Sequence, residues 1–195
     1  MATLERIHFV PHYLVRRENA VAYSPSSSRP SIEGLPQIFW ADYAPWREAN
    51  LWAVERATTG DASLKTVASN MNGLLNYAKF LESRDLQWFE FPARKADRCL
   101  VLYRGALIKM RDAGQISPST ASEYMRNCIM FYRWVRHREL LSPHVQLWRE
   151  KPYVVKYFDR VGFERTISGT TTDLSIPNRK RPGQTLEDGL LPVSE

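Results

Sequence analysis

Apolar side chains recur with the 3.6-residue period of an α-helix in four stretches of the chain. This pattern predicts helices over residues 45–57, 62–83, 95–113 and 117–137. The second stretch has the most regular stripe, with apolar positions at Leu64, Val67, Ala68, Met71, Leu74, Leu75, Ala78 and Leu81. Stripes of this kind need apolar partners, so we expect the four helices to pack around a common core.

Capping residues mark several ends of these helices. Pro45 stands at the first-turn position that tolerates proline, and Asp61 is placed to cap the second helix. Gly114 follows the third helix, where a left-handed backbone conformation favours glycine. Ser117 and Pro118 then form a typical N-cap and first helical position for the fourth helix.

The residues before the helices differ in composition. Residues 24–31, SPSSSRPS, form a Ser/Pro run that indicates a loop or linker. The segment VPHYLV, residues 10–15, could pair as a short strand. We therefore interpret residues 1–34 as an N-terminal arm.

Beyond Pro143 the helical periodicity ends. YVVKYF (153–158) and the stretch around TISGTTTDLSI (166–176) are rich in β-branched residues and could form a hairpin. Residues 178–195 show no periodicity and are typical of an interdomain linker.

Together these patterns predict a mainly α protein. The expected fold is a four-helix bundle with an N-terminal arm and a short possible β-hairpin after the bundle. The expected divisions are an arm over residues 1–34, a helical domain over residues 35–150, and the hairpin and linker over residues 151–195.

Aromatic residues are abundant enough to build a core, since the chain of 195 residues contains six Trp, nine Tyr and eight Phe. Phe131, Tyr132 and Trp134 lie on or beside the apolar stripe of the fourth helix, and we expect them in the core rather than on a base-stacking platform. Cys99 and Cys128 have apolar neighbours and lack the spacing of a zinc site. We expect both to be buried, reduced thiols.

Several functional classes find no support in the sequence. There is no run of eighteen apolar residues and no secretory signal, so we expect a cytoplasmic protein without a membrane partner. Neither GxxxxGK[ST] nor GxGxxG occurs, and the carboxylates are scattered. We therefore assign no catalytic residue, no cofactor and no metal.

Positive charge is concentrated in the middle of the chain. Lys and Arg outnumber Asp and Glu by 13 to 7 over residues 61–138, whereas the counts are 6 and 6 over residues 1–60 and 8 and 8 over residues 139–195. The middle segment therefore carries the whole net charge of +6. A local basic excess favours a polyanionic partner, because Lys and Arg that bind phosphates release condensed counterions.

The third and fourth helices carry a distinctive order of turn and aromatic residues. In order along the chain these are Gly114, Ser117, Pro118, Thr120, Phe131, Tyr132 and Trp134. The second helix adds LLNYAKFLESRDL, residues 74–86, with a Phe-Leu pair near its end. Over about residues 45–140, this order resembles the N-terminal core-binding (SAM-like) domain of the tyrosine recombinase, or phage integrase, family.

The resemblance implies that the helical module lies on one side of duplex DNA while a C-terminal catalytic domain, outside this chain, grips the other. The implied function is DNA binding by the N-terminal part of a site-specific tyrosine recombinase in DNA integration or recombination, with self-association on DNA in the full-length enzyme. The family's catalytic His-x-x-Arg pair is absent, because the residues three positions after the histidines are Pro11, Val15, Leu140 and Leu147. We therefore expect this chain alone to be inactive in strand cleavage.

The resemblance also assigns DNA contacts to the polar faces of the second and fourth helices. The assigned residues are Lys65, Ser69, Asn72, Asn76, Lys79, Ser119, Thr120, Arg126 and Arg133. Lys and Arg would neutralise phosphates, the hydroxyls would hold backbone oxygens, and Asn could read an adenine edge. The basic tract at residues 178–181 is a second candidate. Two alternatives stay open: these are solvated faces of ordinary helices, or the chain is a helical interaction module that binds an acidic protein.

Overall fold

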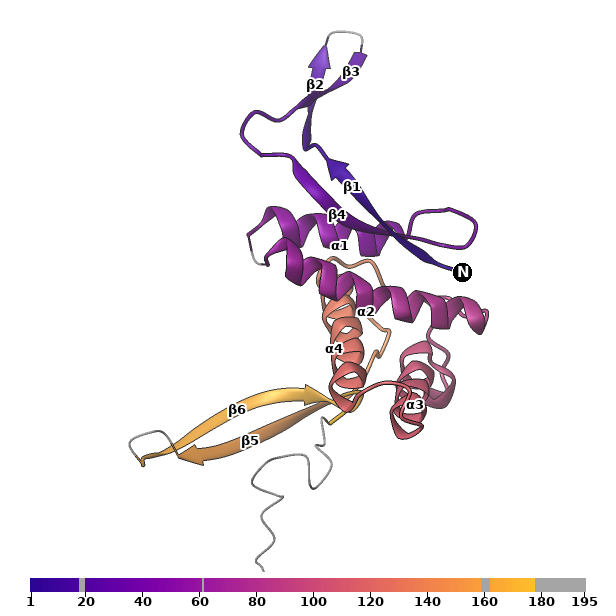
Figure 1. The fold of residues 1–195 in the computed structure, drawn as a ribbon, viewed down its shortest axis with the longest axis vertical. Helices are drawn as coiled ribbons and strands as arrows, with labels where there is room; N and C mark the ends of the chain where they lie inside the picture. The colour runs from indigo at the N-terminus through magenta and orange to yellow at the C-terminus, as the bar shows by residue number, and fades with distance from the viewer. Residues whose placement is uncertain (18–19, 61, 159–161, 178–195) are drawn as a thin grey trace, which may run out of the picture.

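The structure is a computed structural model that describes residues 1–17, 20–60, 62–158 and 162–177. Helices and paired strands follow one another along the chain (Figure 1). The helices are α1 (Arg47–Thr58), α2 (Leu64–Ser83), α3 (Cys99–Asp112) and α4 (Pro118–His137), and a 3-10 turn (Lys95–Asp97) precedes α3. The strands form three antiparallel pairs: β1 (Thr3–Phe9) with β4 (Ile32–Phe39), β2 (His12–Arg17) with β3 (Ala20–Pro25), and β5 (Glu150–Phe158) with β6 (Glu164–Thr172).

The prediction of a mainly α, SAM-like four-helix bundle is wrong as a fold class. Within the described residues the protein is mixed α/β, because three small antiparallel sheets accompany the four helices. The helices lie close to their predicted ranges, and α4 covers residues 118–137 as expected. The strand content exceeds the prediction because a two-stranded ribbon has no buried centre, and its residues therefore alternate only weakly between apolar and polar.

Residues 1–17 and 20–39 form two successive antiparallel strand pairs, which together make a long bent ribbon (Figure 1). β1 and β4 pack on α2, β4 also packs on α1, and Leu35 and Ile38 of β4 are fully buried. Asn50 of α1 fixes this contact: its side chain accepts a hydrogen bond from the Ile38 N–H (2.7 Å) and donates one to the Ile38 carbonyl (3.0 Å). The β2–β3 pair continues the ribbon and stands away from the helices (Figure 1).

The helix ends confirm most of the capping predictions. Gly114 has a φ of 73°, the left-handed conformation expected after α3. Ser117 caps α4 by accepting a hydrogen bond from a backbone N–H three residues on (3.0 Å), and Pro118 occupies the first turn. Ser63 caps α2, whereas the predicted cap, Asp61, lies outside the described residues.

Aromatic side chains form the centre of the core, as predicted. Trp46 is buried and contacts Phe131, with ring centroids 5.3 Å apart. Tyr132 is fully buried beside them. The thiols of Cys99 and Cys128 are buried and free, which confirms their sequence-based interpretation. In the described part of the chain, no helix has the length and apolar character needed to cross a membrane.

Helices α2 and α4 cross at an unusually close contact. A Cβ atom at Gly73 would lie 2.4 Å from Nδ2 of Asn127, so no larger residue fits there without movement. Asn127 is fully buried and its Oδ1 accepts a hydrogen bond from Nδ2 of Asn70 (2.9 Å). A glycine and two buried amides therefore set the approach of the two helices whose outer faces were assigned to DNA.

Candidate nucleic-acid interface

The exposed face of α4 carries two arginines, Arg126 and Arg133, that line one groove. This groove, of about 740 Å³, lies between α4 and the base of the β5–β6 hairpin, and we call it the α4–hairpin groove. Hydroxyl side chains of Ser122 on α4 and of Thr170 and Thr171 on β6 also line it. The groove therefore combines positive charge with hydroxyl groups, the donors that bind phosphate oxygens in protein–DNA complexes.

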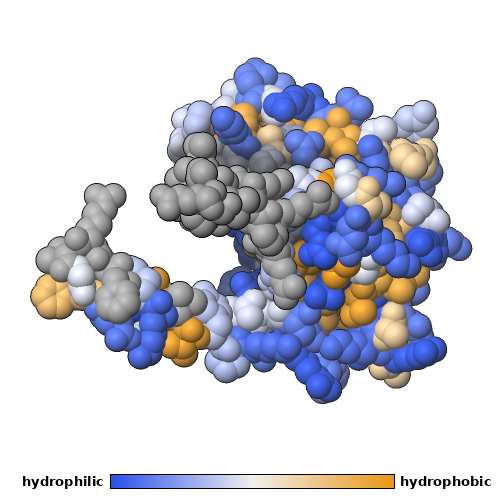
Figure 2. All heavy atoms as spheres, turned by 60° about the horizontal axis from the view of Figure 1, so that its bottom comes forward, coloured by the Kyte–Doolittle hydropathy of each residue, from blue (hydrophilic) through white to orange (hydrophobic). Residues whose placement is uncertain are grey.

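Basic side chains around α3 hold the hairpin segment beside α4. Arg98 donates to a backbone carbonyl just before the hairpin (2.6 Å), and Arg104 donates to one just after it (3.1 Å). Lys95 forms an ion pair with Asp173. Burial alone would raise the pKa of Asp173, but hydrogen bonds from Lys95 and from the Arg149 N–H outweigh it and lower that pKa. Anchored in this way, the hairpin projects from the helical body (Figure 2).

The thirteen Lys and Arg residues of the middle segment divide into two groups. One group is engaged in ion pairs, hydrogen bonds or contacts with aromatic rings, and comprises Arg84, Arg94, Lys95, Arg98, Arg104, Arg111, Arg126, Arg136 and Arg138. For the other group no such partner is found among the described residues, and it comprises Lys65, Lys79, Lys109 and Arg133. Three of these last four were assigned to DNA from the sequence. A cation without an internal partner can neutralise a phosphate at no cost to the fold.

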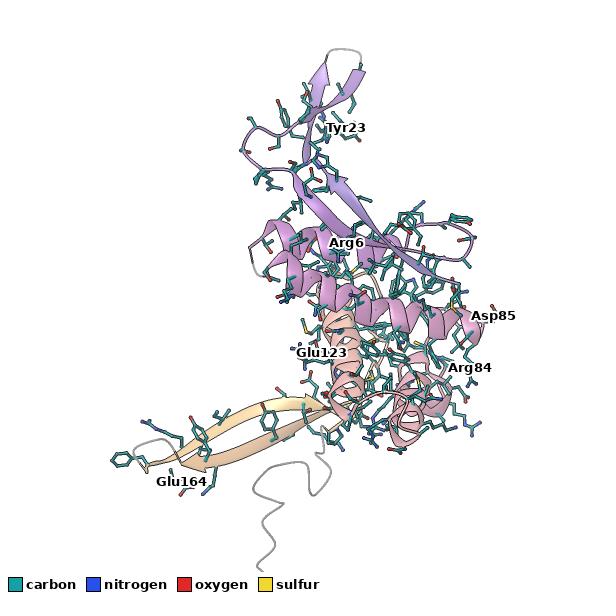
Figure 3. All side chains as sticks on the ribbon, in the orientation of Figure 1. Arg6, Tyr23, Arg84, Asp85, Glu123 and Glu164 are labelled. Atoms are coloured by element: carbon teal, nitrogen blue, oxygen red, sulfur yellow. The ribbon has the colours of Figure 1, made fainter. Side chains whose placement is uncertain are left out.

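Arg126 has an internal partner that a phosphate would have to displace. Its guanidinium donates two hydrogen bonds to the Glu123 carboxylate (2.7 and 3.0 Å), and these bonds raise the pKa of Arg126. Figure 3 shows Glu123 on the side of α4 toward which the hairpin extends. The Arg126 side chain is exposed and that of Glu123 is partly exposed, and such surface pairs contribute only about 0–1 kcal/mol. A phosphate can therefore compete with Glu123 for Arg126.

The residues assigned on α2 do not line the α4–hairpin groove. Three of them are exposed on the outer face of α2, namely Lys65, Ser69 and Asn72. Asn76 accepts a hydrogen bond from the Tyr103 hydroxyl (2.8 Å), so it contributes to the packing of α3. Lys79 is half-buried. The α2 and α4 faces thus remain two separate surfaces.

The hydroxyls assigned at the start of α4 belong to its cap. The side-chain oxygens of Ser119 and Thr120 each lie 2.8 Å from Oγ of Ser117, which is the N-cap residue. Ser119 is exposed, whereas Thr120 is half-buried. Their hydroxyls therefore stabilise the start of α4, and a ligand would have to compete with Ser117 for them.

A second, smaller groove of about 260 Å³ lies between α1 and α4 and is also lined by Arg133. Glu55 in this groove accepts hydrogen bonds from Trp134 (2.7 Å) and Arg138 (2.6 Å). Burial alone would raise the pKa of Glu55, but the bonds from Arg138 and Trp134 outweigh it and lower that pKa. The carboxylate is thus satisfied by other partners, and Arg133 stays available between the two grooves.

Sequence reasoning missed the contribution of the hairpin to the α4–hairpin groove. Tyr153 of β5 lines it together with the threonines of β6. A Cβ atom at Gly169 would lie 2.8 Å from the Tyr153 ring, so only glycine lets this ring lie across the hairpin. That glycine among β-branched residues was the available signal, because glycine inside a strand often marks a close approach.

Comparison of the chain with family models, with curated proteins and with solved structures finds no match. Within the described ranges, no group of three His, Cys, Asp or Glu side chains is arranged to hold a metal ion. The basic tract at residues 178–181 lies outside those ranges. A functional assignment therefore has to rest on the geometry and charge of the site itself.

Proposed function

We propose that this chain binds duplex DNA and is the N-terminal DNA-binding part of a site-specific tyrosine recombinase. The observation that carries DNA binding is the α4–hairpin groove, in which Arg126 and Arg133 lie beside a row of hydroxyls. The family assignment is supported by the order of turn and aromatic residues from Gly114 to Trp134.

The groove favours a polyanion over a small ligand. It is open to solvent, and its arginines lie two helical turns apart, close to 10 Å along the axis at about 1.5 Å per residue. Successive phosphates of one DNA strand lie several ångströms apart, so two such arginines suit neighbouring phosphates along a backbone. Most contacts of this kind fix the position of the protein on DNA and carry no sequence information.

The test is binding of the purified chain to a labelled random-sequence duplex over a range of salt concentrations. We expect affinity that falls with salt, and the Arg133→Ala variant should lower the slope of log K against log salt by about 1. Absence of duplex binding at low salt, or affinity that ignores salt, would reject the proposal.

Lys109→Ala is the matched control. Lys109 is an exposed cation of α3 that, like Arg133, has no ion-pair or hydrogen-bond partner among the described residues, but it does not line the α4–hairpin groove. Both variants remove one positive charge, so a general electrostatic effect would weaken binding equally. Loss confined to Arg133→Ala supports the groove. Equal affinity of both variants and the parent chain would remove Arg133 from the proposed surface.

A further inference from the structure

The β5–β6 hairpin presents two chemically different faces. Opposite residues of an antiparallel pair share a face, so the register places on one face Lys151, Tyr153, Tyr157, Arg165, Ile167 and Thr171. We call this the tyrosine face. The acidic strand residues, Glu150 and Glu164, both fall on the opposite face, where Glu164 forms an ion pair with Lys156 (2.7 Å). The described residues of the tyrosine face therefore carry positive charge and no negative charge.

The tyrosine face is continuous with the proposed DNA surface on α4. Tyr153 belongs to this face and also lines the α4–hairpin groove beside Arg126 and Arg133. Asp173, which directly follows β6 at the base of the hairpin, is already engaged by Lys95. One basic surface thus runs from α4 onto the hairpin.

Apolar area on the tyrosine face stays uncovered by the described part of the chain. Tyr153 is 42% exposed, Tyr157 is 44% exposed and Ile167 is 50% exposed. Exposed apolar groups next to cations suit a partner that offers anionic and apolar contacts together. The major groove of DNA does so, because it presents thymine methyl groups between two rows of phosphates.

The dimensions of the hairpin also suit a DNA groove. Each strand has nine residues, which corresponds to a length of about 30 Å at about 3.3 Å per residue. A two-stranded ribbon fits the major groove of B-DNA, which is about 12 Å wide. The outer end of the hairpin, where Figure 3 labels Glu164, lies far from α4, so the ribbon can reach into a duplex held at the α4–hairpin groove.

We propose that the β5–β6 hairpin is a DNA-reading ribbon, which enters the major groove with its tyrosine face while α4 holds the adjacent phosphates. This inference rests on the proposed function, since it requires that the chain binds duplex DNA. Tyr153 and Tyr157 then contact bases or sugars, and Lys151 neutralises a phosphate at the edge of the groove.

Photo-crosslinking tests the placement directly. A random-sequence duplex with 5-iodouracil in place of thymine carries its reactive iodine in the major groove, where it crosslinks to nearby aromatic side chains on irradiation. We expect crosslinked peptides that contain Tyr153 or Tyr157. In the double variant Tyr153→Phe/Tyr157→Ala, the crosslinks at position 157 should be lost. Crosslinks confined to aromatic residues outside the hairpin would overturn the inference.

Two charge variants give a matched comparison. Lys151→Gln removes a cation from the tyrosine face, whereas Lys156→Gln removes one from the opposite face of the same strand. We expect only Lys151→Gln to lower the salt slope, by about 1. Equal effects of the two variants would contradict the proposed orientation of the ribbon.

A shortened hairpin separates this inference from the proposed function. Replacing residues 154–168 with Asn-Gly keeps the Tyr153–Gly169 pair and closes it with a turn suited to a two-residue hairpin. We expect unchanged thermal stability and duplex affinity reduced about tenfold, as for the loss of a few contacts. If the intact and shortened chains bind duplex equally, the ribbon is rejected and the proposed function stands. If the intact chain fails to bind duplex, both are rejected.

Discussion

Replacing Gly73 with alanine tests how tightly α2 and α4 cross. In an exposed helix this change stabilises a protein by about 1 kcal/mol, because alanine is the better helix former. Here the new methyl group would lie 2.4 Å from Nδ2 and 3.0 Å from Cβ of Asn127. The amide end could rotate away, but Cβ is fixed to the backbone of α4. The two helices therefore have to move apart.

The expected loss of stability follows from three contributions. Overpacking costs about 1–3 kcal/mol, and displacement of Asn127 leaves the buried amide of Asn70 unpaired at a further cost of about 1–3 kcal/mol. The gain in helix propensity offsets about 1 kcal/mol of this. We therefore expect Gly73→Ala to lower the free energy of unfolding by about 1–5 kcal/mol.

Urea unfolding followed by tryptophan fluorescence measures this loss. Gly105→Ala is the control, because Gly105 lies inside α3 and no other part of the structure lies within 4 Å of the place that a Cβ would take, so this change should stabilise the chain slightly. The double variant Gly73→Ala/Asn127→Ala should be more stable than the sum of the single changes predicts, since the second change vacates the space that the methyl needs. If Gly73→Ala proves as stable as Gly105→Ala, the close crossing is refuted.

Three further outcomes follow from two buried thiols, one buried amide and one partly buried carboxylate. Burial raises the pKa values of Cys99 and Cys128, so both thiols should resist a thiol reagent at neutral pH until urea unfolds the chain; rapid labelling of the native protein would contradict their burial. Asn50→Ala should cost about 1–3 kcal/mol in thermal or urea unfolding, because it leaves the buried N–H of Ile38 unpaired, while the Ile38 carbonyl keeps its hydrogen bond from the Trp46 N–H; an unchanged midpoint would exclude this. The folded-state pKa of Glu55 is lowered, so the ionised carboxylate contributes stability above its unfolded pKa that is lost as pH falls through the folded pKa. Glu55→Gln should therefore destabilise the chain at neutral pH and converge with the parent chain in acid, and a gap that is independent of pH would argue against the assignment.

The helices could be predicted because their signals are local. The cap at Ser117, the proline that follows it and the glycine at position 114 each act within one turn, and all three occur as expected. The ribbon made by β1 to β4 depends instead on pairing between strands that lie apart in the sequence. Pro36 and Gly34 in β4 count against a strand, yet Pro36 pairs with Arg6 because a two-stranded ribbon leaves one edge of each strand without a partner strand.

The candidate site was only partly predictable for a similar reason. Sequence periodicity assigned Asn72 to a polar surface, and this residue is exposed. Asn70 and Asn127 are chemically identical to it but are buried, because each faces the other at a crossing that no single helix encodes. Gly73 was the sequence signal for this close crossing, since a glycine inside a helix costs about 1 kcal/mol relative to alanine and therefore indicates a packing constraint.

The net charge of the middle segment overstates the surface that it offers to DNA. Lys95, Arg98 and Arg104 are part of the basic excess, yet they hold the hairpin segment in place. In the α4–hairpin groove the remaining cation is Arg133, together with Arg126 once Glu123 is displaced, whereas Lys65 and Lys79 lie on the separate α2 face. Two phosphate contacts correspond to a salt slope of about −1.8, and Lys151 would bring it to about −2.7. Such a modest electrostatic contribution gives limited affinity, so uncharged contacts from the groove hydroxyls and the tyrosine face have to supply much of the binding free energy. The shortened hairpin, which removes such contacts, therefore tests the proposal more sharply than a variant that changes only the net charge.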